Sequence, residues 1–179
     1  MYFISTDGTD CPIQEPTPFD RRWWSVKFNG PGVRYEVAVA LRKSSIVHIN
    51  GPYACGANPD KKIFGYKLKH KLDLAGERTF VDKGYIGLED TCTFIDKQGL
   101  VNGRNSPRMR KTVVAIQARH ESVFKRMKQF RVLKTKFRHD LSLHQYCFRA
   151  VAAIVQMNIK TDEPLFEYDS WLKQRNGYI

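Results

Sequence analysis

Cysteine is scarce in this sequence: only four occur in 179 residues, and no two of them form a Cys-x-x-Cys pair. Their wide spacing argues against a disulfide framework and a structural zinc site, so we expect reduced thiols. Glycine-rich phosphate-binding loops of the Walker or Rossmann type are also missing, which leaves ATP and NAD without support. There is no apolar run of membrane-spanning length and no secretory leader, so we expect an intracellular protein outside the membrane.

Positive charge is what the sequence has in excess. Thirty Lys and Arg residues stand against eighteen Asp and Glu residues, which gives a formal net charge of +12. A surface of this kind attracts polyanions, and DNA or RNA is the first candidate. The hydrophobic content of 42% and the length of 179 residues suit one globular α/β domain with a sizeable core.

Apolar and polar residues alternate along much of the N-terminal half, which predicts strands. The first strand, residues 2–6, is expected to stop at the turn-forming sequence Asp7-Gly8-Thr9. An antiparallel meander is expected next, over residues 23–28, 34–41 and 45–49. A short buried strand at residues 78–81 would end at Asp82, and residues 91–95 would add an edge strand.

Three helices are expected between and after these strands. Asn58-Pro59 is typical of an N-cap with proline at the first helical position, opening a helix to about residue 72. Ser106-Pro107 repeats that signal for a long basic helix to about residue 130, and Asp140 would cap a third helix over residues 141–159. The order of elements predicts a mixed α/β domain, for which a ribonuclease H-like fold is one solution among several.

Three acidic residues stand where a nuclease would place metal ligands. Asp7 and Asp82 lie at predicted strand ends, and Glu121 lies inside the long basic helix. Carboxylates that converge from separate elements suit a pair of Mg²⁺ or Mn²⁺ ions, which activate the attacking oxygen and stabilise the leaving one. Each acid also has an ordinary interpretation. Both aspartates are common turn formers, and Glu121 has Lys125 four residues on, as in a surface ion pair.

A series of unequal motifs gives these acids a joint context. In chain order they are DGTDCPIQEP from Asp7, GPGVRYEV from Gly30, GPYACG from Gly51, PDKKIF from Pro59, DKGYIG from Asp82, ARHE from Ala118 with Lys128 beyond it, FRH from Phe137 and PLF from Pro164. The series resembles the DDE superfamily endonuclease domain of PIF/Harbinger-like transposases.

The resemblance implies a nuclease domain over residues 1–166 with a C-terminal tail at 167–179. It implies a ribonuclease H-like fold, a mixed sheet with an initial antiparallel meander flanked by helices. Asp7, Asp82 and Glu121 would be the catalytic acids and the ligands of two Mg²⁺ or Mn²⁺ ions. The substrate would be DNA, at transposon ends and target sites. Nuclear import, a separate Myb-like DNA-binding partner and a homo-oligomer are further expectations from the family.

The chain also departs from the family pattern. Relatives often have His-Asp where this chain has Pro59-Asp60, so Asp60 is an accessory acid without the neighbouring histidine. Relatives often carry Asn three residues after the third acid, where this chain has Phe124. The family's N-terminal helical region does not precede Asp7, from which we expect a fragment or a truncated gene.

Basic residues follow the third acid closely and are expected to contact DNA phosphates. The candidates are Lys125, Lys128, Arg131 and Lys134, with a simply solvated basic face as the alternative. Two other functions stay open at this point. One is a domesticated, non-catalytic transposase remnant that binds DNA, for which charge alone would suffice. The other is an RNA-binding domain, which would need aromatic platforms rather than converging acids.

Overall fold

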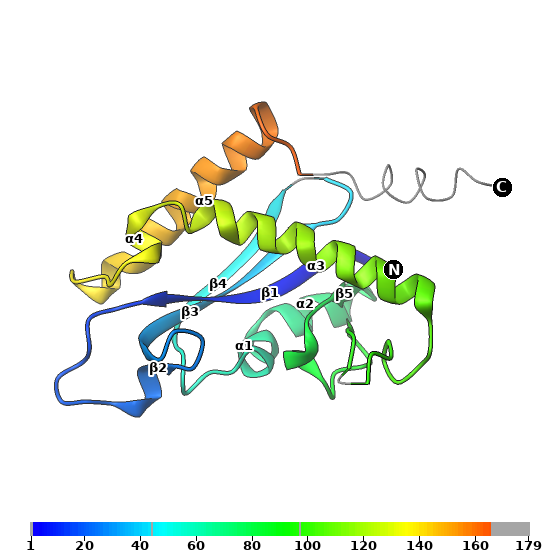
Figure 1. Ribbon diagram of the computed structural model, residues 1–179, viewed down its shortest axis with the longest axis horizontal. Coiled ribbons are helices and arrows are strands. Elements are labelled where there is room, and N and C mark those ends of the chain that lie inside the picture. The colour runs from blue at the N-terminus through cyan, green and yellow to red at the C-terminus, as the bar shows by residue number, and fades with distance from the viewer. Residues whose placement is uncertain (1, 44, 97, 166–179) are drawn as a thin grey trace.

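The computed structural model describes residues 2–43, 45–96 and 98–165, which form a mixed sheet with helices on both faces (Figure 1). Three long antiparallel strands make up its first half. They are β1 (Tyr2–Pro12), β3 (Gly30–Ala40) and β4 (Ile46–Ala54), and β3 lies in the middle. The two-residue strand β2 (Trp24–Ser25) pairs with the start of β3.

The other edge of β1 carries the parallel part of the sheet. β5 (Arg78–Phe80) pairs with the first half of β1, and β6 (Cys92–Thr93) pairs with β5. The order across the sheet is therefore β4-β3-β1-β5-β6. Because β5 is short and β1 is long, the second half of β1 extends beyond the strand beside it.

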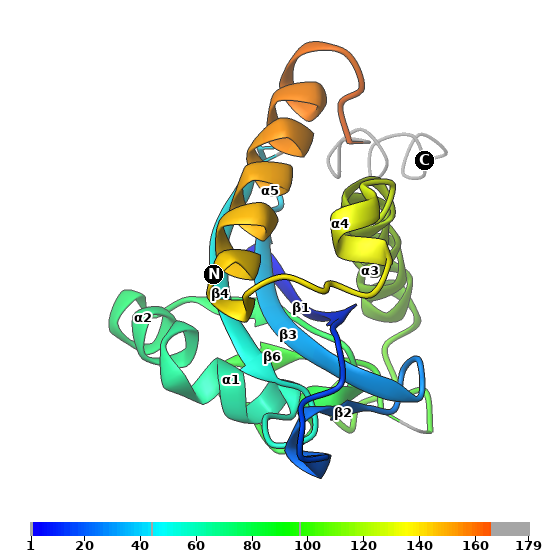
Figure 2. The same ribbon diagram turned by 90° about the vertical axis from the view of Figure 1, so that its left-hand side faces the viewer.

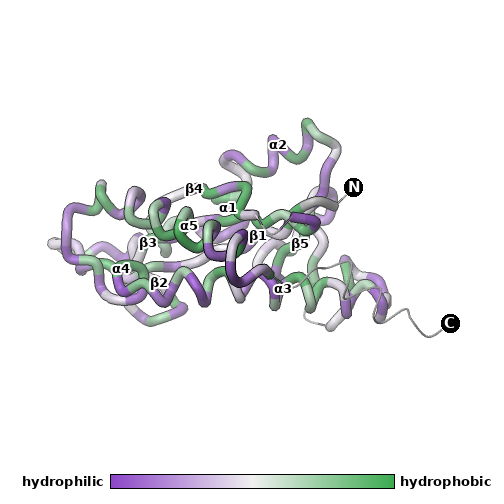
Figure 3. Tube along the Cα trace, turned by 90° about the horizontal axis from the view of Figure 1, so that it is seen from above, coloured by the Kyte–Doolittle hydropathy of each residue, from purple (hydrophilic) through white to green (hydrophobic). Residues whose placement is uncertain are grey.

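Helices cover the two faces of the sheet unequally (Figure 2). The smaller pair packs on one face, and a longer set packs on the other. The first pair is α1 (Asp60–Tyr66) and α2 (Leu68–Ala75); the second set is α3 (Pro107–Met127), α4 (Arg131–Lys134) and α5 (His144–Thr161). Hydrophilic and hydrophobic residues alternate along α3, as expected of a helix with one buried side (Figure 3).

Alternation along β3 divides the core into two parts. Tyr35 and Val37 join the larger cluster with α3 and α5, whereas Ala38 joins the cluster beneath α1 and α2. Within the larger cluster the ring of Tyr35 stacks on Phe148 of α5, with centroids 3.8 Å apart. β3, which the sequence predicts from alternation as one strand of a meander, is thus buried on both faces.

The predicted end of the first strand at Asp7 is wrong. β1 continues through Asp7-Gly8-Thr9 to Pro12, and Asp7 pairs with Val37 of β3. The glycine does not make a turn; its missing side chain leaves room for a carboxylate from another element. The predicted meander strand at residues 23–28 is likewise reduced to β2, so β1 itself is the first long strand of the meander.

The predicted helix from Asn58-Pro59 is also interrupted. It divides at Lys67, whose φ of −142° is not helical, into α1 and α2. Pro59 occupies the N-cap position, and the side-chain amide of Asn58 donates to the Ala54 carbonyl instead of capping the helix. The expected cap is therefore displaced by one residue.

The other predicted elements are confirmed with adjusted ends. Residues 34–41 and 45–49 correspond to β3 and β4, residues 78–81 to β5, and residues 91–95 to the shorter β6. The two C-terminal helices are α3 and α5, the latter preceded by a 3₁₀ turn that the Asp140 side chain caps. The predicted tail at 167–179 lies outside the described residues.

The four cysteines carry no disulfide, as expected. Among the helices of the described residues, none combines the length and the apolar character that a membrane crossing requires.

We expect Phe148→Ala to lower the free energy of unfolding by about 3–5 kcal/mol, because it removes a fully buried ring from the Tyr35 stack. Tyr146→Ala is the matched control on the same helix. Its side chain is 65% exposed, so its effect should stay within about 0.5 kcal/mol. Denaturant unfolding of both variants measures the difference, and equal losses would contradict the described position of α5.

Candidate functional site

The three acids chosen from the sequence line one cavity of about 350 Å³. Asp7 comes from the middle of β1, Asp82 lies two residues beyond the end of β5, and Glu121 comes from α3. Residues far apart in the chain thus share one concave surface. Ser5, Lys83, Asp96, Gln117 and His120 are among the other polar side chains that line it.

Strand register brings the two aspartates together. Ser5 of β1 pairs with Phe80 of β5 in the parallel ladder, and each aspartate lies two residues further along its strand direction. Side chains two residues apart on a strand share a face, so Ser5 and Asp7 point to the same side of the sheet. Asp82 lies outside the strand pairing because β5 ends at Phe80. Its side chain caps the following 3₁₀ turn by accepting a hydrogen bond from Gly84 N at 2.7 Å.

Two buried residues fasten α3 to the sheet beside Glu121. His120 Nδ1 and Ser5 Oγ share a hydrogen bond of 2.9 Å, and Arg119 donates to the Ala40 carbonyl at 2.6 Å. Burial, followed by the charge of Arg119, lowers the pKa of His120 to about 3, so the imidazole is neutral at any working pH. Glu121 is the next residue and is exposed at the mouth of the cavity.

Asp7 is the most perturbed acid of the site. Burial raises its pKa to about 7, and the charges of Asp82 and Asp60 add to that rise. The charge of Lys27 and a hydrogen bond from the Gly8 N–H, at 2.7 Å, oppose it without balancing it. A partly buried carboxylate with so little compensation is more stable in its neutral form.

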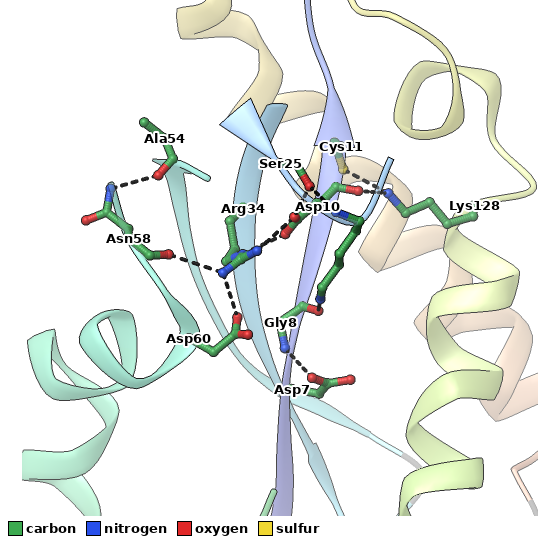
Figure 4. Close-up of polar contacts among 11 residues, drawn as sticks. Asp7, Gly8, Asp10, Cys11, Ser25, Arg34, Ala54, Asn58, Asp60 and Lys128 are labelled. Atoms are coloured by element: carbon green, nitrogen blue, oxygen red, sulfur yellow. Dashed lines mark hydrogen bonds and ion pairs between the residues drawn. The ribbon is translucent and has the colours of Figure 1, made fainter. Parts of the chain in front are cut away.

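Asp60 approaches from the other face of the sheet, at the start of α1 (Figure 4). A Cβ atom at Gly8 would lie 1.9 Å from Asp60 Oδ1, so the carboxylate occupies the space that this glycine leaves open on β1. Burial raises the pKa of Asp60, and the charge of Asp82 adds to that rise. The accessory acid is therefore near the aspartates, although it does not line the cavity with them.

A buried ion pair holds this region in place (Figure 4). Asp10 and Arg34 are cross-strand partners, and the guanidinium donates to both carboxylate oxygens, at 2.6 and 2.8 Å. Ser25 also donates to Asp10, and Arg34 reaches Asp60 at 3.5 Å. Hydrogen bonds from Arg34 and Ser25 outweigh the opposing effect of burial and lower the pKa of Asp10.

The donor set of the cavity fits hard divalent cations. Asp7, Asp82 and Glu121 offer only oxygen ligands. The positive charge near the buried Asp7 carboxylate is too small to offset the effect of burial on its pKa. Within the described ranges no three His, Cys, Asp or Glu side chains converge closely enough to hold one ion. Mg²⁺ is commonly held by one or two carboxylates together with water and substrate phosphates, so convergence of three is not required of it.

The predicted DNA-contacting residues fall into two groups. Lys125, Arg131 and Lys134 are exposed on α3 and α4. Lys128 is partly buried, and its ammonium donates to the carbonyls of Asp10 and Leu133 and to Cys11 Sγ. It therefore links the end of α3 to β1.

Sequence reasoning missed Asp10, Arg34 and Lys27 as members of this region. A weak signal existed for the first pair, because an acid and a base on adjoining strands can pair across a sheet. That signal required the true length of β1, which the Asp-Gly-Thr sequence concealed. Lys27 carried no local signal at all.

We expect Asp7→Asn to stabilise the metal-free protein, by an amount that depends on pH. The folded state of the parent favours protonated Asp7, so that stability is present below pH 3.8 and is lost as pH rises towards 7. The variant cannot ionise, so its advantage should grow over this interval, reach at most about 4 kcal/mol and stay constant above it.

Denaturant unfolding in EDTA from pH 5 to pH 9 measures this difference. Asp140→Asn serves as the control, because hydrogen bonds at its cap lower the pKa of Asp140, so that carboxyl is ionised in both the folded and the unfolded state over this range. The difference between Asp140→Asn and the parent should therefore not change with pH. A pH-independent difference between Asp7→Asn and the parent would show that Asp7 is not a strained buried acid.

A search of curated proteins and a search of solved structures return no significant similarity. The family model described as DDE superfamily endonuclease matches residues 6–157, which is most of the chain and includes all three acids of the cavity. The chain belongs to the DDE superfamily endonuclease family.

Proposed function

We propose that this chain is the catalytic domain of a transposase-type DNA endonuclease that works with two Mg²⁺ or Mn²⁺ ions. The observation that carries the proposal is the common cavity of Asp7, Asp82 and Glu121. Family membership supports a nuclease and a DNA substrate. The PIF/Harbinger type, a nuclear location, a Myb-like partner and a homo-oligomer belong to the proposal as family expectations.

The sheet supports a ribonuclease H-like fold as part of this proposal. An antiparallel meander of β1, β3 and β4 continues into the parallel strands β5 and β6, with helices on both faces. In this arrangement the first acid is on the central strand, and the second is at the end of the parallel strand beside it. The third comes from a helix packed over them.

Asp7, Asp82 and Glu121 would hold the ions in this mechanism. Bound divalent ions would activate the attacking water or 3′-hydroxyl and stabilise the leaving oxygen. The chain's own contribution is positioning. Paired strands fix the two aspartates, and the His120–Ser5 hydrogen bond fixes the helix turn that carries Glu121. Exposed Lys125, Arg131 and Lys134 would attract the DNA backbone.

We expect Asp7→Asn, Asp82→Asn and Glu121→Gln each to reduce Mn²⁺-dependent nicking of supercoiled DNA more than about 100-fold. Loss of a group that only orients a metal ligand already costs about 10- to 100-fold. DNA binding should persist in the variants, because the basic surface is intact.

Asp140→Asn is the control here too. It removes one negative charge at an exposed cap that asparagine can also make. Nicking by the three site variants at the parental rate, with unchanged DNA binding, would instead favour the non-catalytic DNA-binding remnant, which the charge of +12 alone could support.

A further inference from the structure

Lys27 lies at the acidic site, although it is on the loop between β2 and β3. Its ammonium donates to the carbonyl of Gly8 at 2.8 Å, and the N–H of the same glycine donates to Asp7 Oδ1 at 2.7 Å. Figure 4 shows Gly8 and Asp7 with the hydrogen bond between them. One residue of β1 thus bonds to the positive group and to the first acid.

The charge of Lys27 acts on two of the neighbouring acids. Burial raises the pKa of Asp7, and Lys27 is the strongest influence against that rise. Burial likewise raises the pKa of Asp60, and Lys27 opposes it after Arg34. Arg34 is already bound to Asp10 by a bidentate pair. Of these two cations, Lys27 is therefore the one that is not already paired with a carboxylate in a bidentate contact.

The ammonium of Lys27 also has N–H donors that make no hydrogen bond within the described residues. Within residues 2–43, 45–96 and 98–165, Gly8 is the one hydrogen-bond partner of its ammonium, which leaves two of three N–H donors for a ligand. The ammonium of Lys128, by comparison, has three partners within the protein. The loop around Lys27 is open, since Val26 is 86% exposed and Phe28 is 38% exposed.

We propose that Lys27 contacts a DNA phosphate at the acidic site, an inference that rests on the proposed nuclease function. Several carboxylates gathered at one place repel a phosphate, and a cation beside them offsets that repulsion. A lysine ammonium suits this role, because it is a compact charge that binds phosphate without a fixed geometry. Without DNA, the Gly8 carbonyl holds the ammonium close to where the phosphate would bind.

The proposal gives opposite expectations for metal and for DNA. Lys27→Gln removes a cation that competes with metal ions, so Mn²⁺ affinity of the DNA-free protein, measured by calorimetry, should rise at least about twofold. The same variant loses a phosphate contact, so the slope of log K against log salt for duplex DNA should become shallower by about 0.9. Binding is measured in Ca²⁺, and nicking in Mn²⁺ should slow at least about tenfold.

Two further variants separate a phosphate contact from a structural role. Lys27→Arg keeps the charge and should restore the parental salt slope. Lys62→Gln removes a comparable exposed lysine that also donates to a main-chain carbonyl, at 3.0 Å from Ala57, and should leave Mn²⁺ affinity unchanged. Circular dichroism confirms that each variant is folded.

An unchanged salt slope, or weaker Mn²⁺ binding in Lys27→Gln, would overturn the proposal, because Lys27 would then only support β1. A parent protein that never nicks DNA would contradict the proposed function instead. The calorimetric and salt-slope measurements would still decide the role of Lys27 in that case.

Discussion

The pairing of β1 on both edges is the constraint on which the site depends. β3 fixes its register on one side and β5 on the other, and a slip of one residue would turn every side chain to the opposite face. With this register Ser5 and Asp7 face α3, whereas Gly8 and Asp10 face Arg34 and α1. One strand therefore contributes an acid to the cavity and a structural ion pair to the opposite face.

Charge balance differs between those two faces. Asp10 is buried but fully compensated, because Arg34 and Ser25 both donate to it, and its pKa falls. Asp7 is also largely removed from water, but it has only its neighbour's N–H and the more distant Lys27, and its pKa rises to about 7. A divalent cation would supply the charge that Asp7 lacks, which links the imbalance to the proposed metal site.

Local signals in the sequence predicted part of this arrangement. Asp82 after a short strand and the Ser106-Pro107 helix start follow from propensities of neighbouring residues, and the structure agrees with both. Asp-Gly-Thr is different, because the sequence suits a turn, and only the carboxylate of Asp60 explains why this position of a strand carries glycine. Lys27 and Arg34 matter through partners far along the chain, which no local pattern reveals.

Glu121 shows how exposure and function can coincide. Its spacing from Lys125 is that of an ordinary surface ion pair, and the structure leaves it exposed. It nevertheless lines the cavity, because the His120–Ser5 bond brings that turn of α3 against β1. A module that only binds DNA needs exposed cations and gains nothing from burying Asp7. Burial of that acid lowers the stability of the metal-free fold, and a cation bound beside the carboxylate would offset this loss.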